Sequence, residues 1–252
     1  MVVETASAQP CSPANAVGIP IIVSTPSVET ASTKMRMCPN ALGRHDVLTK
    51  QTVETESAKA CRRANAIDKP AVVSTLSDAF FNEPAFSFIV PDAAARKRAL
   101  EKAFRIIVDE DHKIGSIMMT SGAEAATAWR TPGLVRDSQW DAIRTGLPYL
   151  LAFGTAIGRA SLVAKLIKSH LPVGEYWYLH YAGCHSSHRS KGFGGAAIRA
   201  GLEQADAARC KAYLETADEN NIPIYRALGF HIMHSWQVPD GPQFWGMMRG
   251  PR

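Results

Sequence analysis

A glycine-rich segment in the last third of the chain constrains the fold more than any other feature of the sequence. Residues 185–197 read H-S-S-H-R-S-K-G-F-G-G-A-A. Residues 176–184 come directly before it and have the aromatic and apolar content of a buried strand. Small and apolar side chains recur every three or four positions across residues 195–209, which predicts a helix. We therefore expect a strand, a glycine-rich turn and a helix in succession.

This arrangement is suited to binding a phosphate group. Glycines let the backbone approach a ligand closely, and the free N–H groups at the start of a helix attract negative charge. Arg189 and Lys191 add two positive charges beside the turn. The spacing is neither the dinucleotide-binding fingerprint nor the P-loop. It is R-S-K-G-F-G from Arg189 to Gly194, a pattern that, taken alone, fits a simple glycine-rich connection equally well.

A second motif follows about thirty residues later and makes coincidence a poor explanation. Residues 221–230 read N-I-P-I-Y-R-A-L-G-F, and they come after an L-E-T strand end at residues 214–216. The two motifs together resemble those of the GNAT superfamily of acetyl-CoA-dependent N-acetyltransferases. The resemblance runs from about residue 60 to the end of the chain, and it is closest to the branch that contains puromycin N-acetyltransferase.

The resemblance implies an α/β fold, a six- or seven-stranded mixed sheet flanked by helices whose central parallel strands splay apart at the cofactor site. The residue pattern is compatible with this fold. From the pattern we expect strands at residues 64–67, 113–119, 124–129, 176–184, 211–216, 231–238 and 243–248. Helices are expected to begin at Asp68 and at Asp92 and to cover residues 135–152, 157–170, 195–209 and 222–228, while residues 81–90 are expected to form an aromatic loop.

The first 52 residues differ from the remainder of the chain. Ser, Thr, Ala and Pro dominate there, and aromatic residues are absent. V-E-T recurs at Val3, Val28 and Val53, a step of 25 residues, but only the third copy continues into aromatic residues. A solenoid would need complete units with their own apolar faces. We therefore expect residues 1–52 to form a low-complexity, mostly disordered extension, with a docking or targeting tail as the alternative, and residues 53–252 to form the acetyltransferase domain.

The composition narrows the classes of partner. The net charge of +5 suits a polyanionic ligand such as coenzyme A, and the chain lacks the dense basic runs with interleaved aromatics that are typical of nucleic-acid binding. The five cysteines are scattered, which favours a reducing, cytoplasmic setting. The apolar stretch at 147–167 contains Arg159 and Lys165, so a packed helix is expected rather than a membrane span. We expect a monomer or homodimer.

The resemblance implies acetyl-CoA as the cosubstrate, held largely through backbone N–H groups of the glycine-rich turn. The cofactor-binding residues implied are Gly183, Cys184, His185, Arg189, Ser190, Lys191, Gly192, Phe193, Gly194, Gly195 and Asn221, the last also a helix cap. Ser190 stands where the family commonly has glycine. No metal is expected, because the pair His185 and His188 has no carboxylate or cysteine at a supporting spacing.

Three residues are candidates for acid–base catalysis. Tyr225 occupies the family's position for a tyrosine close to the coenzyme sulfur, where a protonated phenol can protonate the leaving thiolate. Glu215 is the first candidate for the base that deprotonates the attacking amine, and His180 is the second. Each of the three also has a purely structural explanation, because buried tyrosines, strand-end glutamates and core histidines often only pack or pair.

The acceptor is expected to be the amine of a small molecule, with a protein or peptide acceptor, or an acyl-CoA-binding module without turnover, as the alternatives. The acceptor pocket is expected to come from residues 80–88 and from the helices between residues 133 and 170. These segments are aromatic and apolar rather than acidic, which favours a partly apolar amine over a polycation.

Overall fold

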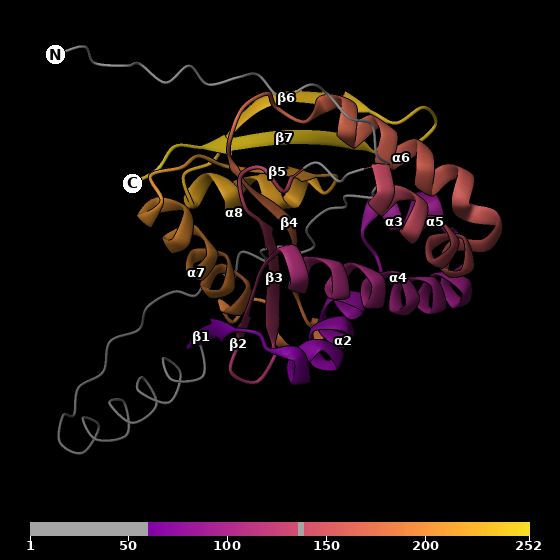
Figure 1. The fold of residues 1–252 in the computed structure, drawn as a ribbon, viewed down its shortest axis with the longest axis horizontal. Coiled ribbons are helices and arrows are strands. Elements are labelled where there is room, and N and C mark those ends of the chain that lie inside the picture. The colour runs from indigo at the N-terminus through magenta and orange to yellow at the C-terminus, as the bar shows by residue number, and fades with distance from the viewer. Residues whose placement is uncertain (1–59, 136–138) are drawn as a thin grey trace, which may run out of the picture.

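The computed structural model describes residues 60–135 and 139–252, which form a seven-stranded mixed sheet in the order β1-β2-β3-β4-β5-β7-β6 (Figure 1). The strands are β1 (Cys61–Arg63), β2 (Gly115–Thr120), β3 (Ala125–Arg130), β4 (Trp177–Cys184), β5 (Ala212–Thr216), β6 (His231–Gln237) and β7 (Gln243–Arg249). Strands β4 and β5 run parallel, and the other neighbouring pairs of this sheet are antiparallel. The expected α/β mixed sheet is confirmed, whereas the extension at residues 1–52 lies outside the described residues.

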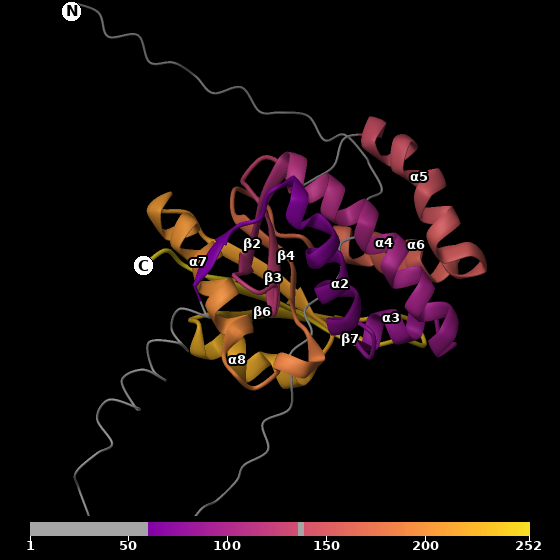
Figure 2. The ribbon, with the colours of Figure 1, turned by 90° about the horizontal axis from the view of Figure 1, so that it is seen from below.

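Helices cover both faces of the sheet. They are α2 (Lys69–Ala79), α3 (Pro84–Ile89), α4 (Ala93–Ile114), α5 (Gln139–Phe153), α6 (Ile157–His170), α7 (Phe193–Ala207) and α8 (Ile222–Ala227). Figure 2 shows α2 and α4 on one side of the central strands and α7 and α8 on the other. We call the first side the α4 face and the second the α7 face.

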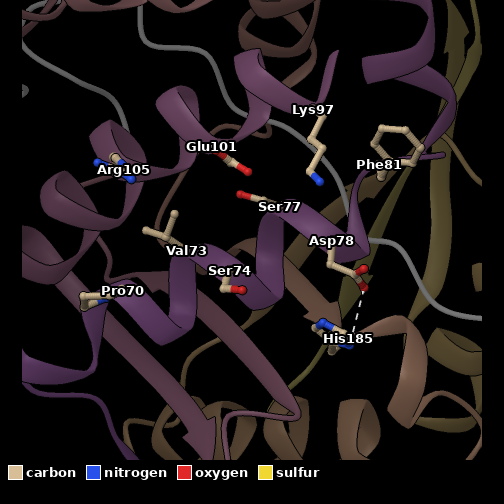
Figure 3. Close-up of a pocket in the computed structure, with 10 residues that line it drawn as sticks. All are labelled: Pro70, Val73, Ser74, Ser77, Asp78, Phe81, Lys97, Glu101, Arg105 and His185. Carbon is tan, nitrogen blue, oxygen red and sulfur yellow. Dashed lines mark ion pairs between the residues drawn. The ribbon is translucent and has the colours of Figure 1, made fainter. Parts of the chain in front are cut away.

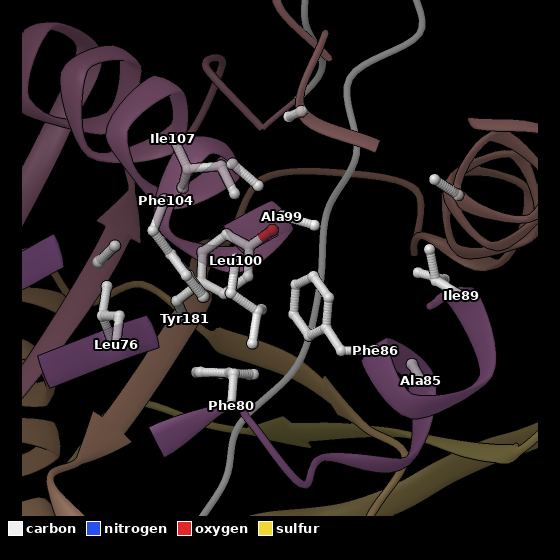
Figure 4. Packing of buried hydrophobic residues seen from close by; sticks show 14 of the residues in the cluster. Leu76, Phe80, Ala85, Phe86, Ile89, Ala99, Leu100, Phe104, Ile107 and Tyr181 are labelled. Atoms are coloured by element: carbon white, nitrogen blue, oxygen red, sulfur yellow. The ribbon is translucent and has the colours of Figure 1, made fainter. Parts of the chain in front are cut away.

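The core on the α4 face is built around aromatic rings. Phe80 from α2, Phe104 from α4 and Tyr181 from β4 meet with ring centroids 5.2–5.6 Å apart (Figure 4). Phe86 from α3 joins the same group at 5.8 Å from Phe80. Such tilted and edge-on pairs are the preferred aromatic geometry, and they add to the stability gained from burying the rings. This cluster fixes α2, α3 and α4 against the central strand β4.

Two expected local structures are wrong. The strand expected at residues 64–67 instead lies at Cys61–Arg63, because Asn65 and Asp68 cap a short 3-10 turn, with the Asn65 side chain accepting from the Ile67 N–H at 2.8 Å. The aromatic loop expected at residues 81–90 contains helix α3, since the Glu83 side chain caps its first turn and Pro84 fits the first helical position.

The apolar segment after residue 146 forms the helices α5 and α6, with a 3-10 turn between them that begins at Gly154. By length and composition the stretch Gly146–His170 could cross a membrane, and about a third of its most apolar window is buried in the described structure. Four residues of α6 are buried in the core cluster of the α4 face: Ala160, Val163, Ala164 and Ile167.

A substitution at Gly201 on α7 tests how closely this helix packs on the sheet. A Cβ atom at this position would lie 2.0 Å from Nε1 of the buried Trp129 indole. We expect Gly201→Ala to lower the free energy of unfolding by about 1–3 kcal/mol in urea denaturation, as overpacking does elsewhere. Gly158→Ala on α6 is the matched control, because a Cβ there meets nothing within 4 Å; it should be neutral or stabilise by up to about 1 kcal/mol. Equal effects of the two substitutions would contradict this packing.

Candidate active site

The central parallel strands separate soon after they begin to pair. Of the described residues, β4 and β5 pair at Trp177 with Ala212 and at Tyr178 with Tyr213, and at no later position. Beyond Tyr178, β4 continues to pair with β3, while β5 continues to pair with β7. The facing edges of β4 and β5 therefore diverge toward their carboxyl ends. This is the splay expected from the fold, and the candidate residues lie around it.

A bulge in β4 turns two consecutive side chains toward the same face. Trp129 of β3 is opposite Leu179, and Ala128 is opposite Tyr181, so His180 is an extra residue in the strand. The Tyr181 ring packs on Phe104 of α4, and His180 bonds to the same helix. Both side chains thus point to the α4 face.

His180 belongs to a buried charged group. Its Nδ1 atom lies 2.6 Å from the Oδ2 atom of Asp111, and the other oxygen of Asp111 accepts from Arg130 Nε at 2.8 Å. Burial raises the pKa of Asp111, but the charges of Arg130 and His180 outweigh it, so the pKa of Asp111 lies below its ordinary value. Asp111 thereby fixes the orientation of the His180 ring. The sequence analysis did not identify Asp111 or Arg130.

Glu215 is buried on the α4 face at the end of β5. Burial raises the pKa of Glu215 to about 7, although hydrogen bonds from the Tyr178 and Tyr213 hydroxyls act in the opposite direction. The Tyr178 ring also lies 5.5 Å from the His180 ring. The structure therefore brings the two candidate bases together on either side of Tyr178. Among the described residues the Oε1 atom of Glu215 has no hydrogen-bond partner, so it is available to a ligand.

Tyr225 lies on α8, on the opposite face of the sheet from Glu215. Its ring is buried beside Leu179 and Leu214, which come from the two diverging strands. Burial, and then the negative charge of Asp218, raise the pKa of Tyr225 well above its ordinary value. The hydroxyl is buried and has no hydrogen-bond partner in the described part of the chain. The Tyr225 phenol is therefore protonated, and its O–H group donates no hydrogen bond to any described residue.

Asn221 does not cap α8 as expected. It is the residue before that helix, but its side chain makes no capping bond within the described structure. Instead, its Nδ2 atom donates to Thr216 Oγ1 at 3.4 Å. The side chain is fully buried and ties the end of β5 to the start of α8.

The glycine-rich turn joins the end of β4 to α7, as expected. Gly192 has a φ of 86°, and α7 starts at the next residue with no side-chain cap from any described residue. Ser190 also has a positive φ, 59°, which explains why glycine is favoured at this position. Phe193, Gly194 and Gly195 form the first turn of the helix. Their N–H groups lie at the positive end of a 15-residue helix.

The turn is held by the end of α2. The Ser186 backbone N–H and hydroxyl both donate to Asp78, and Arg189 Nη2 donates to the Ala79 carbonyl at 3.2 Å. Lys191 Nζ donates to the Ser187 carbonyl at 3.2 Å. The two basic side chains thus keep the shape of the turn in this structure, and their charge stays beside it.

Packing explains why a glycine and a cysteine stand at the end of β4, at positions 183 and 184. A Cβ at Gly183 would lie 2.7 Å from that of Ala79, so glycine lets α2 approach the strand closely. Cys184 is buried beside Phe193 and Ala197, and burial raises the pKa of its thiol. His185 accepts from the Ser187 N–H and lies 3.8 Å from Asp78. Among the described residues no group of three or more His, Cys, Asp or Glu is arranged to hold a metal ion.

A pocket of about 630 Å³ lies between α2 and α4, next to the glycine-rich turn (Figure 3). Its walls carry charges of both signs from Asp78, Lys97, Glu101 and Arg105. His185 is the one residue that the walls drawn in Figure 3 share with the candidate cofactor-binding set. No candidate catalytic residue is among the ten residues drawn there. This pocket is therefore separate from the gap between β4 and β5.

Glu83 is a further acidic residue at the site that the sequence analysis missed. It caps α3 through the Phe86 N–H at 2.9 Å, and its Oε1 atom is buried without a hydrogen-bond partner among the described residues. Burial raises its pKa to about 8, and the charge of Asp218 contributes in the same direction. The charge of the same Asp218 also raises the pKa of Tyr225. The only signal in the sequence was an acidic residue before a proline.

Comparison with known proteins agrees with this geometry. The seven-stranded mixed sheet with flanking helices is the fold of the GNAT acetyltransferases. The model of the acetyltransferase (GNAT) family matches residues 124–230, which include β4, the glycine-rich turn, Glu215 and Tyr225. This part of the chain is therefore similar to the GNAT acetyltransferases, and the similarity supports an N-acetyltransferase. The finer assignment to the puromycin N-acetyltransferase-like branch stays a prediction.

Solved structures show the same fold at low sequence identity. A histone acetyltransferase HPA2 and related acetyltransferase from Corynebacterium glutamicum is 24% identical, with a TM-score of 0.58 over 77% of this chain and 96% of its own. Arylalkylamine N-acetyltransferase 2 from Aedes aegypti is 12% identical, with a TM-score of 0.51 over 77% of this chain and 99% of its own. An agmatine N-acetyltransferase is 10% identical, with a TM-score of 0.51 over 76% and 98%.

The raised pKa of Glu83 predicts a dependence of stability on pH. The unfolded chain loses this proton near pH 4.3, whereas the folded protein keeps it until about pH 8. Between these values the wild type must bind a proton to fold, so it loses up to about 1.4 kcal/mol of stability per pH unit as the pH rises. Glu83→Gln keeps the capping oxygen and removes this loss. In urea denaturation, the stability of the variant relative to wild type should increase from about pH 4.5 to about pH 8 and then level off.

The exposed Glu203 on α7 provides the matched control. Glu203→Gln should give a stability difference that does not change with pH in this way. Parallel pH curves for wild type and Glu83→Gln would contradict the buried, protonated state of Glu83.

Proposed function

We propose that this protein transfers an acetyl group from acetyl-CoA to the amine of a small molecule by direct attack of the amine on the thioester. The observation that carries the proposal is a pair of unused polar atoms at the splay: Glu215 Oε1 on the α4 face and the Tyr225 hydroxyl on the α7 face. Leaving a buried polar atom without a partner costs about 1–3 kcal/mol, so such atoms are usually kept for a ligand or a reaction.

The two groups have the protonation states that acetyl transfer requires. An amine attacks only as the free base, and a carboxyl group with a pKa near 7 can take up its proton at neutral pH. The leaving thiolate of coenzyme A needs a proton, and Tyr225 holds one at any physiological pH. Because they lie on opposite faces of the sheet, the base and the acid can act on opposite sides of one thioester placed in the splay. His180, fixed by Asp111, is the alternative base.

The cosubstrate is assigned to the turn between β4 and α7. The positive end of α7, with Gly192, Gly194 and Gly195 at or before its first turn, suits the pyrophosphate of coenzyme A. The pantetheine arm would lie along the open edge of β4 near Gly183, Cys184 and His185. Asn221, which joins β5 to α8, is placed to contact the same molecule.

The acceptor is an amine on a partly apolar body. The segment from Phe80 to α3 offers buried aromatic rings, and it also offers the buried carboxyl group of Glu83. That carboxyl group modifies the expectation of a non-acidic pocket, because in its protonated form it can donate a hydrogen bond to a polar group of the acceptor. The described cysteines Cys184 and Cys210 are free thiols, which supports a reducing compartment such as the cytoplasm.

A thiol-release assay over a panel of amines tests this function. The panel contains an arylalkylamine, a diamine, an aminoglycoside and a lysine-containing peptide, each offered with acetyl-CoA. We expect release of free coenzyme A with the arylalkylamine or the diamine, and an acetylated amine of the corresponding mass. Turnover with the peptide alone would instead identify a protein acetyltransferase. Binding of acetyl-CoA without release of thiol from any acceptor would leave only a binding module.

Tyr225→Phe separates the role of the hydroxyl from that of the ring. We expect the rate of acetyl transfer to fall by about 10²-fold, because the leaving thiolate loses its proton donor. The free energy of unfolding should stay the same or rise by about 1 kcal/mol, since the variant removes a buried hydroxyl that has no partner. Tyr149→Phe, which removes a hydroxyl on α5, is the matched control and should keep the rate. An unchanged rate in Tyr225→Phe at every pH would eliminate Tyr225 as the acid.

A further inference from the structure

Three residues of neighbouring strands form a row that leads from Glu215 to the edge of the sheet. Glu215 on β5 is opposite Gly246 on β7, and Gly246 is opposite His234 on β6. Strand β6 is the last strand of the sheet. Because the central position of the row is a glycine, no side chain stands between Glu215 and His234 on the strand that separates them.

Tyr213 fills the space above that glycine. It precedes Glu215 by two residues on β5, so both side chains point to the same face. Tyr213 lies close enough to the Glu215 carboxyl group to lower the pKa of that group, and its hydroxyl lies 3.4 Å from Nε2 of His234. A Cβ at Gly246 would lie 2.6 Å from this hydroxyl and 2.5 Å from His234 Nε2. Glycine at position 246 is therefore what allows the two side chains to meet.

His234 connects this group to solvent. It is half-buried, and its neighbours Met233 and Ser235 on the edge strand are exposed. The titratable groups that face it are Tyr213 from β5 and His170 from α6, whose ring lies 5.9 Å away. Burial and His170 lower the pKa of His234, so a proton that arrives on this imidazole at neutral pH is released readily.

We propose that Tyr213 and His234 form a proton relay that carries the proton taken up by Glu215 to the solvent at the edge of the sheet. The inference rests on the proposed function, in which Glu215 deprotonates the attacking amine. The amine nitrogen forms its bond to the acetyl carbon and gives its proton to the Glu215 carboxylate. Glu215 then passes a proton to the Tyr213 oxygen while the Tyr213 hydroxyl proton moves to His234 Nε2. His234 loses a proton to water, and Glu215 is again a carboxylate.

The relay has a kinetic signature that a structural role of His234 does not have. Without it, Glu215 can still accept one proton, so the first turnover keeps its rate, whereas later turnovers wait for Glu215 to lose that proton. We expect His234→Ala and His234→Gln to keep the rate of the first coenzyme A release and to lower the steady-state rate on the order of tenfold, less than the 10²–10⁴-fold expected from removing an acid–base group itself. Added imidazole should restore the steady-state rate of His234→Ala.

Three further variants complete the test. Gly246→Ala separates Tyr213 from His234 while keeping both residues, and it should reproduce the slow steady state. His231→Gln, on the exposed end of the same strand, is the matched control and should behave as the wild type. Glu215→Gln should slow the first turnover as well, and imidazole should not restore it.

The outcomes distinguish the relay from the proposed function. A slow steady state after a normal first turnover in the His234 variants, with recovery in imidazole for His234→Ala, supports the relay. Steady-state rates equal to wild type at every pH and buffer concentration would overturn the relay and leave the acetyltransferase intact. Failure of the wild type itself to release thiol with any amine would overturn the proposed function and the relay with it.

Discussion

Two parallel strands that stop pairing leave backbone N–H and C=O groups without sheet partners, and buried groups of that kind must find others. In this protein the divergence of β4 from β5 after Tyr178 and Tyr213 creates such edges in the middle of the sheet. An extended ligand arm can satisfy them as an added strand would. The glycine-rich turn lies at the end of β4, and α8 follows β5, so the turn proposed to bind phosphate and the phenol of Tyr225 are both positioned by the strands that diverge.

The surrounding packing is what keeps the splay from closing. Phe80, Phe104 and Tyr181 hold α2 and α4 against one strand, while Trp129 and Leu202 belong to the cluster that holds α7 and α8 on the other face. A rigid apolar frame makes the buried acids expensive to ionise, which is the physical reason why the pKa of Glu215 rises to about 7. Burial of Glu215 thus gives its carboxyl group the affinity for protons that a base needs at neutral pH.

The sequence was sufficient for the parts of the site that are local in the chain. The turn at residues 185–197, the helix after it and the motif around Tyr225 each lie within one short segment, where period and glycine spacing are informative. Asp111 and Gly246 could not be found in this way. Asp111 meets His180 across 69 positions of sequence, and the importance of Gly246 depends on strand order and register. Glu83 was not recognised, because both its capping role and its burial depend on helix α3, where a loop was expected.

The segment between β3 and β4 lies next to both the proposed acceptor segment and the proposed proton relay. Its second helix, α6, ends at His170, whose ring stacks on Trp236 at 4.6 Å, and Trp236 in turn stacks on Phe244 at 4.2 Å. Arg159 of the same helix lies 5.9 Å from the ring of Phe88 on α3, the element that also carries the cap Glu83. The helix thus contacts the segment proposed to bind the amine and itself carries the histidine that faces His234. A change in α6 that alters the acceptor pocket would therefore also alter the electrostatic surroundings of the proton exit, so acceptor preference and the pH dependence of turnover should vary together.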